Sequence, residues 1–379
     1  MDENLYAYWL SALSGLWVSS AHRLLEYAGS FKGVWELSEK ELKNPGLKIR
    51  PATIRALLSS KDEVRIIREY RQMEEKGIRF YHLKHELYPS RLRFIYDAPI
   101  GIYLKGSLPD PTVVSVAIVG ARGCSDYGRT STRQLGMRLA EAGFQVISGL
   151  ARGIDGIAQK AAVDAGGYSC AVLGCGPDIC YPEDNRDTYE KLAARGGIIS
   201  EYPPMTPPRN IHFPQRNRII SGLSDIVVVI EAREKSGSLI TADMALEQGR
   251  DVYALPGRIC DPLSYGCNRL IKQGAGIIIS AEEFIRDLAL THNLRSIADS
   301  PDLCIGSDDQ KGRQMTLAAA YSLSDEEKSV LSVIGLDPKS VNAIQDETGL
   351  DTGSLMKSLM NLSVRGLILQ KQGHYVLAD

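Results

Sequence analysis

The chain has 379 residues, which is long enough for two or three domains. Its 44% hydrophobic and 24% charged residues are typical of a globular protein, and its net charge of −2 argues against a basic protein that coats nucleic acid, so any anion site must be a local patch. Because no apolar run approaches the ~18 residues of a membrane helix and the first residues do not resemble a signal peptide, we expect a cytoplasmic protein that contacts no membrane.

Residues 1–75 are expected to form small helices. The segments LYAYWLSALSGL and AHRLLEYAG carry apolar residues at helical spacing, and each ends at a glycine. Asn44, Pro45 and Pro51 are expected to interrupt the helices that follow. Short helices joined by glycine-containing turns are typical of a helix-hairpin-helix or SAM-like module. Modules of this kind bind the DNA backbone or mediate protein contacts, and the sequence favours neither role.

Residues 80–290 show a different pattern, in which short apolar runs rich in β-branched residues are separated by amphipathic helical patterns. The runs are VVSVAIVG, FQVISG, SCAVLGCG, GGIIS, DIVVVI, DVYALPG and GIIIS. Because these runs lack the alternation of a half-exposed strand, they predict a parallel sheet covered by helices on both faces. The predicted fold class is therefore α/β, with an extended Rossmann-like doubly wound sheet.

Residues 291–318 lose this periodicity and are predicted to form a linker. Residues 319–379 then show three helices, a strand, a turn at Gln372-Gly373 and a second strand, which is the pattern of a winged helix. Residues 321–379 contain five basic and eight acidic side chains, a poor electrostatic match to duplex DNA. A protein-contact role agrees with this C-terminal domain at least as well.

Ligands of doubly wound sheets bind beyond the carboxyl ends of the strands. Glycine-rich segments follow four of the predicted strands, and Arg122, Arg152 and Lys235 lie within them. The segments are GARGCSDYGR (120–129), SGLARGIDG (148–156), LGCGPDICYP (173–182) and EAREKSGSLIT (231–241). Glycine permits close approach of the backbone, and helix N-termini offer free N–H donors. The sequence therefore predicts a basic, anion-binding rim, and phosphate is the expected anion.

Other ligand chemistries match the sequence poorly. The GxGxxG of dinucleotide-binding folds is absent after the first predicted strand, and there is no GxxxxGK[ST] phosphate loop. No CxxC pair is present, so no metal is expected. Ser236 and Ser238 have no evident base, and Asp155 is interpreted as a helix N-cap rather than as a general base. We therefore expect no cofactor and no catalytic residue.

The segment FPQRNRIISGLSDIVVVI (213–230) places two arginines directly before an apolar run. Arg216 and Arg218 are two residues apart, so one helical face does not carry both. We expect Arg216 to point to the rim and bind the ligand. Arg218, which precedes Ile219 and Ile220, is expected to anchor the loop through a buried carboxylate. The alternative is that both arginines form structural ion pairs.

Seven motifs in chain order resemble the DNA-processing protein A (DprA, also Smf) family over roughly residues 80–285. The motifs are AIVGARGCSDYGR, VISGLARGIDGIAQKAA, AVLGCGPDICYPEDNR, IISEYPP, FPQRNRIISGLSD, SGSLITADMALEQGRDVYALPG and GCNRLIKQGA. The terminal domains resemble an arrangement found in that family. The resemblance implies a protein that is not an enzyme, binds single-stranded DNA through a basic pocket, forms homodimers and loads the recombinase RecA onto strands taken up in natural transformation.

The resemblance also implies which residues contact DNA, through the family motifs GxR, FPxRNR and a basic residue before SGS. Together with Arg152 of the rim, they are Gly120, Arg122, Phe213, Arg216, Asn217, Arg218, Lys235, Ser236 and Gly237. Arginine and lysine pair with phosphates, and an aromatic ring such as that of Phe213 can stack on an unpaired base. One position departs from the family pattern, because Gln159 stands where the family usually has histidine.

Three classes of function remain to be separated. The preferred one is a recombination mediator that binds and protects single-stranded DNA. The second is a Rossmann-like nucleotide-processing enzyme of the nucleoside-monophosphate hydrolase type, although the PGGxGT signature of that group is absent. The third is an interaction scaffold that does not bind DNA. A phosphate-release screen separates the first two, and a gel-shift comparison of single- and double-stranded oligonucleotides separates the first from the third.

Overall fold

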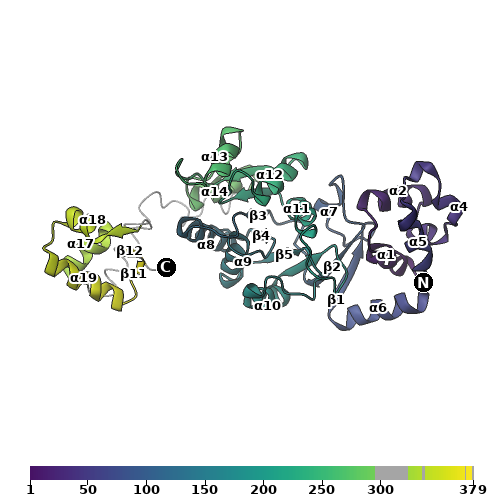
Figure 1. Ribbon diagram of the computed structural model, residues 1–379, viewed down its shortest axis with the longest axis horizontal. Helices are drawn as coiled ribbons and strands as arrows, with labels where there is room; N and C mark the ends of the chain where they lie inside the picture. Colours follow the sequence, from purple (N-terminus) through teal and green to yellow (C-terminus); the bar gives the residue numbers. More distant parts are fainter. Residues whose placement is uncertain (295–322, 335–337, 372, 378–379) are drawn as a thin grey trace. The chain divides into compact units, whose positions relative to one another are not determined.

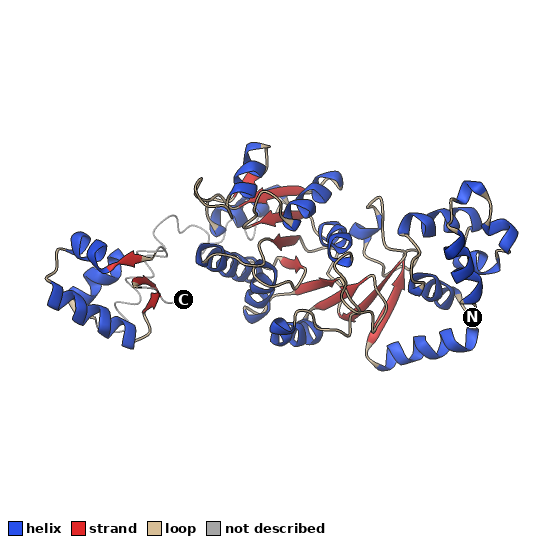
Figure 2. Ribbon diagram, viewed as in Figure 1, coloured by secondary structure: helices blue, strands red, loops and turns tan. Residues whose placement is uncertain are grey.

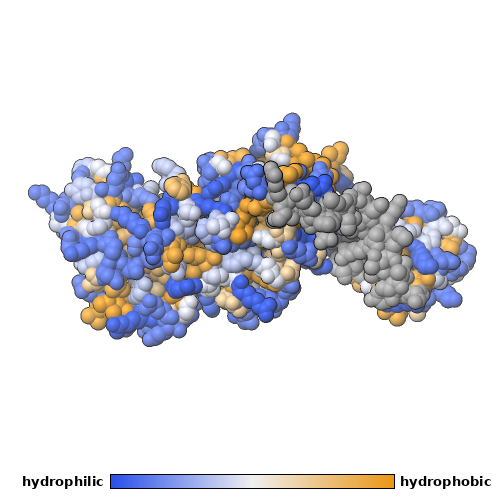
Figure 3. Space-filling view, turned by 180° about the vertical axis from the view of Figure 1, so that it is seen from behind, coloured by the Kyte–Doolittle hydropathy of each residue, from blue (hydrophilic) through white to orange (hydrophobic). Residues whose placement is uncertain are grey.

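The computed structural model describes residues 1–294, 323–334, 338–371 and 373–377 (Figure 1). The chain forms two compact units, one of Met1–Cys124 with Ser131–Ala281 and the other of Ser125–Thr130 with Glu282–Asp379. Within the described residues, no helix is both long and apolar enough to cross a bilayer. The face seen in Figure 3 is a mosaic of hydrophilic and hydrophobic residues.

The first unit is built on a nine-stranded sheet with the order β1-β2-β6-β5-β4-β3-β7-β8-β9. The strands are β1 (Ile78–His82), β2 (Gly101–Gly106), β3 (Ser115–Val119), β4 (Gln145–Ser148), β5 (Ser169–Leu173), β6 (Gly197–Ser200), β7 (Ile226–Val229), β8 (Asp251–Ala254) and β9 (Gly276–Ile277). All pairings from β6 to β9 are parallel, whereas β1 pairs with β2 and β2 with β6 in antiparallel fashion. The seven predicted parallel strands are confirmed, and the antiparallel pair β1–β2 is an addition that the sequence analysis missed.

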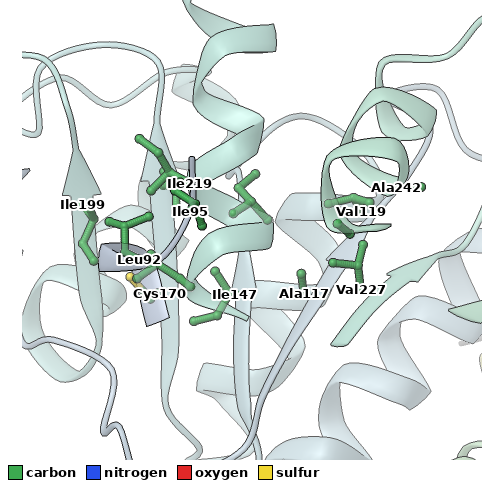
Figure 4. Close-up of a cluster of buried hydrophobic side chains, with 14 of the residues drawn as sticks. Leu92, Ile95, Ala117, Val119, Ile147, Cys170, Ile199, Ile219, Val227 and Ala242 are labelled. Carbon is green, nitrogen blue, oxygen red and sulfur yellow. The ribbon is translucent and has the colours of Figure 1, made fainter. Parts of the chain in front are cut away.

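Helices cover both faces of the parallel strands, as predicted (Figure 2). The helices of the α/β region are α7 (Ser90–Arg93), α8 (Asp126–Glu141), α9 (Ile154–Asp164), α10 (Arg186–Arg195), α11 (His212–Leu223), α12 (Gly237–Glu247) and α13 (Tyr265–Lys272), whereas α14 (Ala281–Thr291) belongs almost entirely to the second unit. On one face, side chains of α7, α11, α12 and α13 share a buried cluster with alternate residues of the strands (Figure 4). On the other face, α9 and α10 pack against the intervening residues of β5 and β6. This alternation follows from the period of two along a strand.

The order of the strands contains a topological switch point. From β3 the chain proceeds through β4 and β5 to β6 on one side, and it then returns to β7, which pairs with the opposite edge of β3. Ala117 of β3 thus lies between Ile147 of β4 and Val227 of β7. The segments that leave the carboxyl ends of β3 and β7 diverge at this point, which is where open α/β sheets bind ligands.

The N-terminal helices pack against the antiparallel edge of the sheet. They are α1 (Glu3–Ala12), α2 (Val18–Ala28), α3 (Phe31–Glu36), α4 (Glu39–Leu42), α5 (Pro51–Ser59) and α6 (Glu63–Glu75). The ring of Tyr8 in α1 meets those of Phe80 in β1 and Tyr103 in β2, with centroids 5.7 and 6.0 Å apart. The Tyr103 hydroxyl lies 2.7 Å from the Ser11 hydroxyl. The helices and β1–β2 therefore share one buried cluster.

The second unit contains the expected winged helix. Its elements are α17 (Asp325–Val333), β10 (Lys339–Ser340), α18 (Val341–Thr348), α19 (Thr352–Val364), β11 (Ile368–Lys371) and β12 (His374–Leu377). The three strands pair in the order β10-β12-β11, and the helices and strands share a small buried cluster. Gln372 of the predicted turn and residues 295–318 of the predicted linker lie outside the described residues.

The shared cluster of helices and strands predicts a large stability loss when Phe80 is truncated. Because Phe80 is buried, Phe80→Ala is expected to lower the free energy of unfolding by about 3–5 kcal/mol. Tyr96 is a matched control, since this residue is 99% exposed, and Tyr96→Ala should change stability by less than about 0.5 kcal/mol. Urea unfolding of both variants tests this. Equal stabilities would mean that the helices do not pack on the sheet as described.

Candidate functional site

Four of the loops at the carboxyl edge of the parallel strands overlap the predicted glycine-rich segments, and we call these four loops the rim. They are residues 120–123 after β3, 149–153 after β4, 174–182 after β5 and 230–237 after β7. Because the strands are neighbours in the order β5-β4-β3-β7, the loops follow one another along the edge. Arg122 and Lys235, on the loops that flank the switch point, are both exposed. Arg152 is also exposed and forms an ion pair with Asp184 at 2.5 Å.

The loop after β4 is held in a strained conformation. Leu150 has a φ of 52°, which costs a residue other than glycine about 1–3 kcal/mol. Gln159 accepts a hydrogen bond from the Leu150 N–H at 2.9 Å, and Asn185 donates to the carbonyls of Leu150 and Ala151 at 2.9 and 3.1 Å. The surroundings therefore fix the backbone of this loop without any ligand.

The loops after β3 and β4 are in direct contact. The first helical N–H of α9, that of Ile154, donates to the Ala121 carbonyl at 3.2 Å. Gly153 has a φ of 74°, and a Cβ atom at this position would lie 2.3 Å from the Ala121 carbonyl oxygen. Only glycine is compatible with this approach. The backbone beside the exposed Arg122 is thus held by its contacts with the loop after β4.

Asp155 and Gln159 of α9 accept hydrogen bonds from the backbone of the loop after β4. The interpretation of Asp155 as a helix N-cap is wrong, since the N-cap of α9 is Gly153, which makes no side-chain cap bond. Asp155 instead accepts from the Gly149 N–H at 3.2 Å. Gln159 is fully buried, and it accepts from Leu150 while its amide donates toward the Ser169 hydroxyl at 3.4 Å. The position at which the chain departs from the family pattern therefore has a structural role here.

Arg216 lies inside the protein rather than on the rim, contrary to our expectation. Only 3% of the residue is exposed. Its Nη1 donates to the Gly149 carbonyl at 2.7 Å and to the Val172 carbonyl, so that it caps the ends of β4 and β5. A Cβ atom on Gly149 would lie 2.2 Å from Nη1, so any larger residue there would displace the guanidinium. The physical reason for this placement is that buried strand-end carbonyls need donors.

The charge of Arg216 is opposed by Asp155. Burial raises the pKa of Asp155, and the nearby Arg216 guanidinium partly opposes that rise. Burial likewise lowers the pKa of Arg216, and Asp155 acts in the opposite direction. The Nε of Arg216 has no hydrogen-bond partner among the described residues. A contact between Arg216 and DNA stays a prediction, because its guanidinium is committed to the protein in this conformation.

Arg218 has carboxylate partners, as we expected, but their side chains are partly exposed rather than buried. Its guanidinium forms ion pairs with Glu201 at 2.7 Å and with Asp97 at 2.9 Å, and 6% of its side chain is exposed. It also donates to the Asp97 carbonyl at 3.1 Å. Arg218 therefore links α11 to the segments that carry Asp97 and Glu201. Of the two arginines, Arg218 has the ion pairs and Arg216 has the strand-end carbonyls.

Aromatic rings gather at the N-terminus of α11. Phe213 is half-buried, and the Cζ atom of Arg122 lies 5.4 Å from the centroid of its ring. Tyr181 stacks on the same ring at 5.6 Å, with 25° between the ring planes. His212, the neighbour of Phe213, stacks on Tyr202 at 4.0 Å and bonds to the Gly174 carbonyl at 3.0 Å. The structure thus brings Arg122 and Phe213 together, and it adds Tyr181, which the sequence analysis did not select.

The loop after β7 is joined to α11 by a hydrogen bond. Asn217 donates to the Gly237 carbonyl at 3.3 Å. Ser236 is the N-cap of α12, and its hydroxyl accepts from the Ser238 N–H at 3.4 Å. Lys235 precedes this cap and projects from an exposed position. The predicted site residues Asn217, Ser236 and Gly237 therefore act together as a support for the loop that carries Lys235.

Truncation of Arg216 is expected to destabilise the protein strongly. Arg216→Ala leaves two strand-end carbonyls and the buried Asp155 without their cation, which predicts a loss of about 3–5 kcal/mol in the free energy of unfolding. Arg209→Ala is the control, because Arg209 is exposed. Urea unfolding decides the point. If Arg216→Ala unfolds at the same urea concentration as the control, the buried guanidinium has no structural role.

Truncation of Arg218 is expected to destabilise the protein less than truncation of Arg216. The side chains of its partners Glu201 and Asp97 are 16% and 44% exposed, so water can solvate them when the cation is removed. The same unfolding experiment compares the two variants directly. A larger loss for Arg218→Ala would contradict the order of burial.

Comparisons with known proteins agree with this geometry. Residues 79–289 match the family model of DNA recombination-mediator protein A, and residues 315–374 match that of the DprA winged helix domain. The DNA processing protein DprA of Bacillus subtilis is 42% identical over 228 residues, which are 59% of this chain and 75% of the relative.

Two solved structures of relatives superpose on the chain. An X-ray structure of DNA processing protein A from Streptococcus pneumoniae has a TM-score of 0.67 at 35% identity and covers 77% of this chain and 98% of its own. A structure on the single-stranded DNA binding mode of DNA processing protein A from Helicobacter pylori has a TM-score of 0.51 at 30% identity and covers 56% of this chain and 96% of its own. With its nine-stranded sheet, its winged helix and its match to the family model over more than half of its length, this chain belongs to the DNA recombination-mediator protein A family, that of the DprA and Smf proteins.

Proposed function

We propose that this protein binds single-stranded DNA at the rim and acts as a recombination mediator, which protects incoming strands and loads RecA during natural transformation. The observation that carries the proposal is the pair of exposed cations, Arg122 and Lys235, on the two loops that flank the switch point. The H. pylori relative, whose structure concerns its single-stranded DNA binding mode, supports the choice of ligand.

The chemistry of the rim fits an unpaired strand. Exposed guanidinium and ammonium groups pair with phosphates without reading sequence. Phe213 and Tyr181, beside Arg122, offer rings on which a base can stack only when it has no partner strand. Because Arg122 already lies over Phe213, a nucleotide can meet a cation and an aromatic ring at one place. Binding is therefore expected to be salt-dependent and largely independent of sequence.

The rim offers little support for nucleotide hydrolysis. The hydroxyls of Ser236 and Ser238 lie 2.8 Å apart and serve the N-terminus of α12. Asp155 is buried beneath the loop after β4, where it accepts a backbone hydrogen bond. We therefore propose a binding protein without catalytic activity. A screen for phosphate release from nucleoside mono- and triphosphates should give no signal above a heat-denatured sample.

Two of the exposed cations beside the switch point, Arg122 and Lys235, are expected to contribute similar amounts to binding. Arg122→Ala and Lys235→Ala should each weaken single-strand binding by about 1–3 kcal/mol and flatten the slope of log K against log salt by about one unit. Both side chains are exposed, so the melting temperature should not change. Salt titrations of a fluorescently labelled oligothymidylate measure both quantities.

Arg195→Ala is the matched control for these variants. Arg195 is exposed at the end of α10, directly before β6, and therefore lies at the amino edge of the sheet. Its truncation should leave affinity and slope unchanged. Wild-type affinity in both rim variants would remove the DNA site from the rim, and equal losses in all three would show only a general effect of net charge.

RecA loading and homodimer formation are the finer parts of the proposal, and the family resemblance supports them. On DNA coated with single-strand binding protein, wild-type protein should accelerate RecA filament assembly, and Arg122→Ala should not. Sedimentation of the full chain should give twice the mass of 41.6 kDa. If wild-type protein binds single strands but does not accelerate assembly, the mediator function is wrong while the binding function stands.

A further inference from the structure

The basic and aromatic residues of the rim follow one another in a fixed order along the edge of the sheet. The neighbouring strands β7, β3 and β4 are followed by loops that carry exposed cations, which are Arg233 and Lys235 after β7, Arg122 after β3 and Arg152 after β4. The next strand, β5, is followed by a loop without a cation but with the aromatic side chain of Tyr181. Neighbouring strands are about 4.8 Å apart, so this row of four loops extends over roughly 15 Å at the strand ends.

Tyr181 presents a ring to solvent beside the cations. It is 44% exposed, although its ring is also stacked on a neighbour. That neighbour is Phe213, and Phe213 in turn is in contact with Arg122. Tyr181, Phe213 and Arg122 therefore form a continuous chain of contacts from the loop after β5 to the loop after β3.

The loop that carries Tyr181 is fixed before any ligand binds. The Cys175 carbonyl accepts from the Ser200 hydroxyl, and the Pro177 carbonyl accepts from the Tyr189 hydroxyl, both at 2.6 Å. The Gly176 N–H donates to the Thr206 carbonyl at 2.9 Å. An aromatic side chain on a fixed loop loses little conformational entropy when a ligand stacks on it.

We propose that bound single-stranded DNA runs along the rim from Lys235 past Arg122 to Tyr181. At the Tyr181 end one base of the DNA stacks on the tyrosine ring, and we call this contact the stacking step. This proposal rests on the proposed function. The phosphates are held by the cations at the switch point, and one base stacks on the exposed part of the Tyr181 ring. Stacking needs a base but no phosphate charge, and this difference separates the role of Tyr181 from that of the cations.

The test compares two probes, an oligothymidylate and an abasic oligomer of the same length. Tyr181→Ala should weaken binding of the oligothymidylate by roughly 5- to 150-fold, the range expected for one lost stack, without changing the salt slope. Binding of the abasic oligomer should not change. Tyr181→Phe should bind like wild type, because the ring remains. Tyr27→Ala is the control, since Tyr27 is 49% exposed on α2 in the N-terminal helices.

Each outcome has one interpretation. If Tyr181→Ala binds both probes like wild type while Arg122→Ala is impaired, the stacking step is wrong and the proposed function stands. If Tyr181→Ala weakens both probes equally, Tyr181 only supports the loop and the step is again wrong. If wild-type protein binds neither probe, the proposed function fails and the step fails with it.

Discussion

The buried guanidinium of Arg216 is the interaction on which the architecture of the rim depends. Parallel strands end in carbonyls that have no further ladder partners, and β4 and β5 end side by side under the proposed ligand. Arg216 donates to both ends from α11 and lies close to the buried carboxylate of Asp155. One side chain of α11 thus joins two strands and the start of α9. The cost of burying a charge is offset by these donors and by its counter-charge.

This buried cation supports the loops from which Arg122 and Lys235 are exposed to a ligand. With Gly149 fixed by Arg216 and Asp155, the strained Leu150 is held by Gln159 and Asn185, and the turn at Gly153 sets the position of the loop after β3. Arg122 therefore projects from a backbone that is already ordered. Strain of this kind concentrates at functional sites, where the surrounding hydrogen bonds over-determine the conformation. The proposed site is accordingly prepared before DNA arrives.

Much of the fold was predictable because its signals are local. Strands buried on both faces are continuous apolar runs, and the winged helix follows from helical spacing and a hairpin turn. The destination of Arg216 was not predictable, since its acceptors lie 67 and 44 residues away in the chain. For the same reason, the stack of Tyr181 on Phe213 left no pattern in the sequence. Strands β1 and β2 were missed because packing on the N-terminal helices defines that edge of the sheet.

Hydrogen–deuterium exchange of the full chain, with and without an oligothymidylate, tests whether single-stranded DNA binds at the rim. We predict new protection in the loops 120–123, 149–153, 174–182 and 230–237, with the largest change at the loops that are least protected in the free protein. The amino edge of the sheet, around Arg195, should exchange as before. Protection confined to the N-terminal helices or to the winged helix, with the four loops unchanged, would contradict the assignment of the DNA site to the rim.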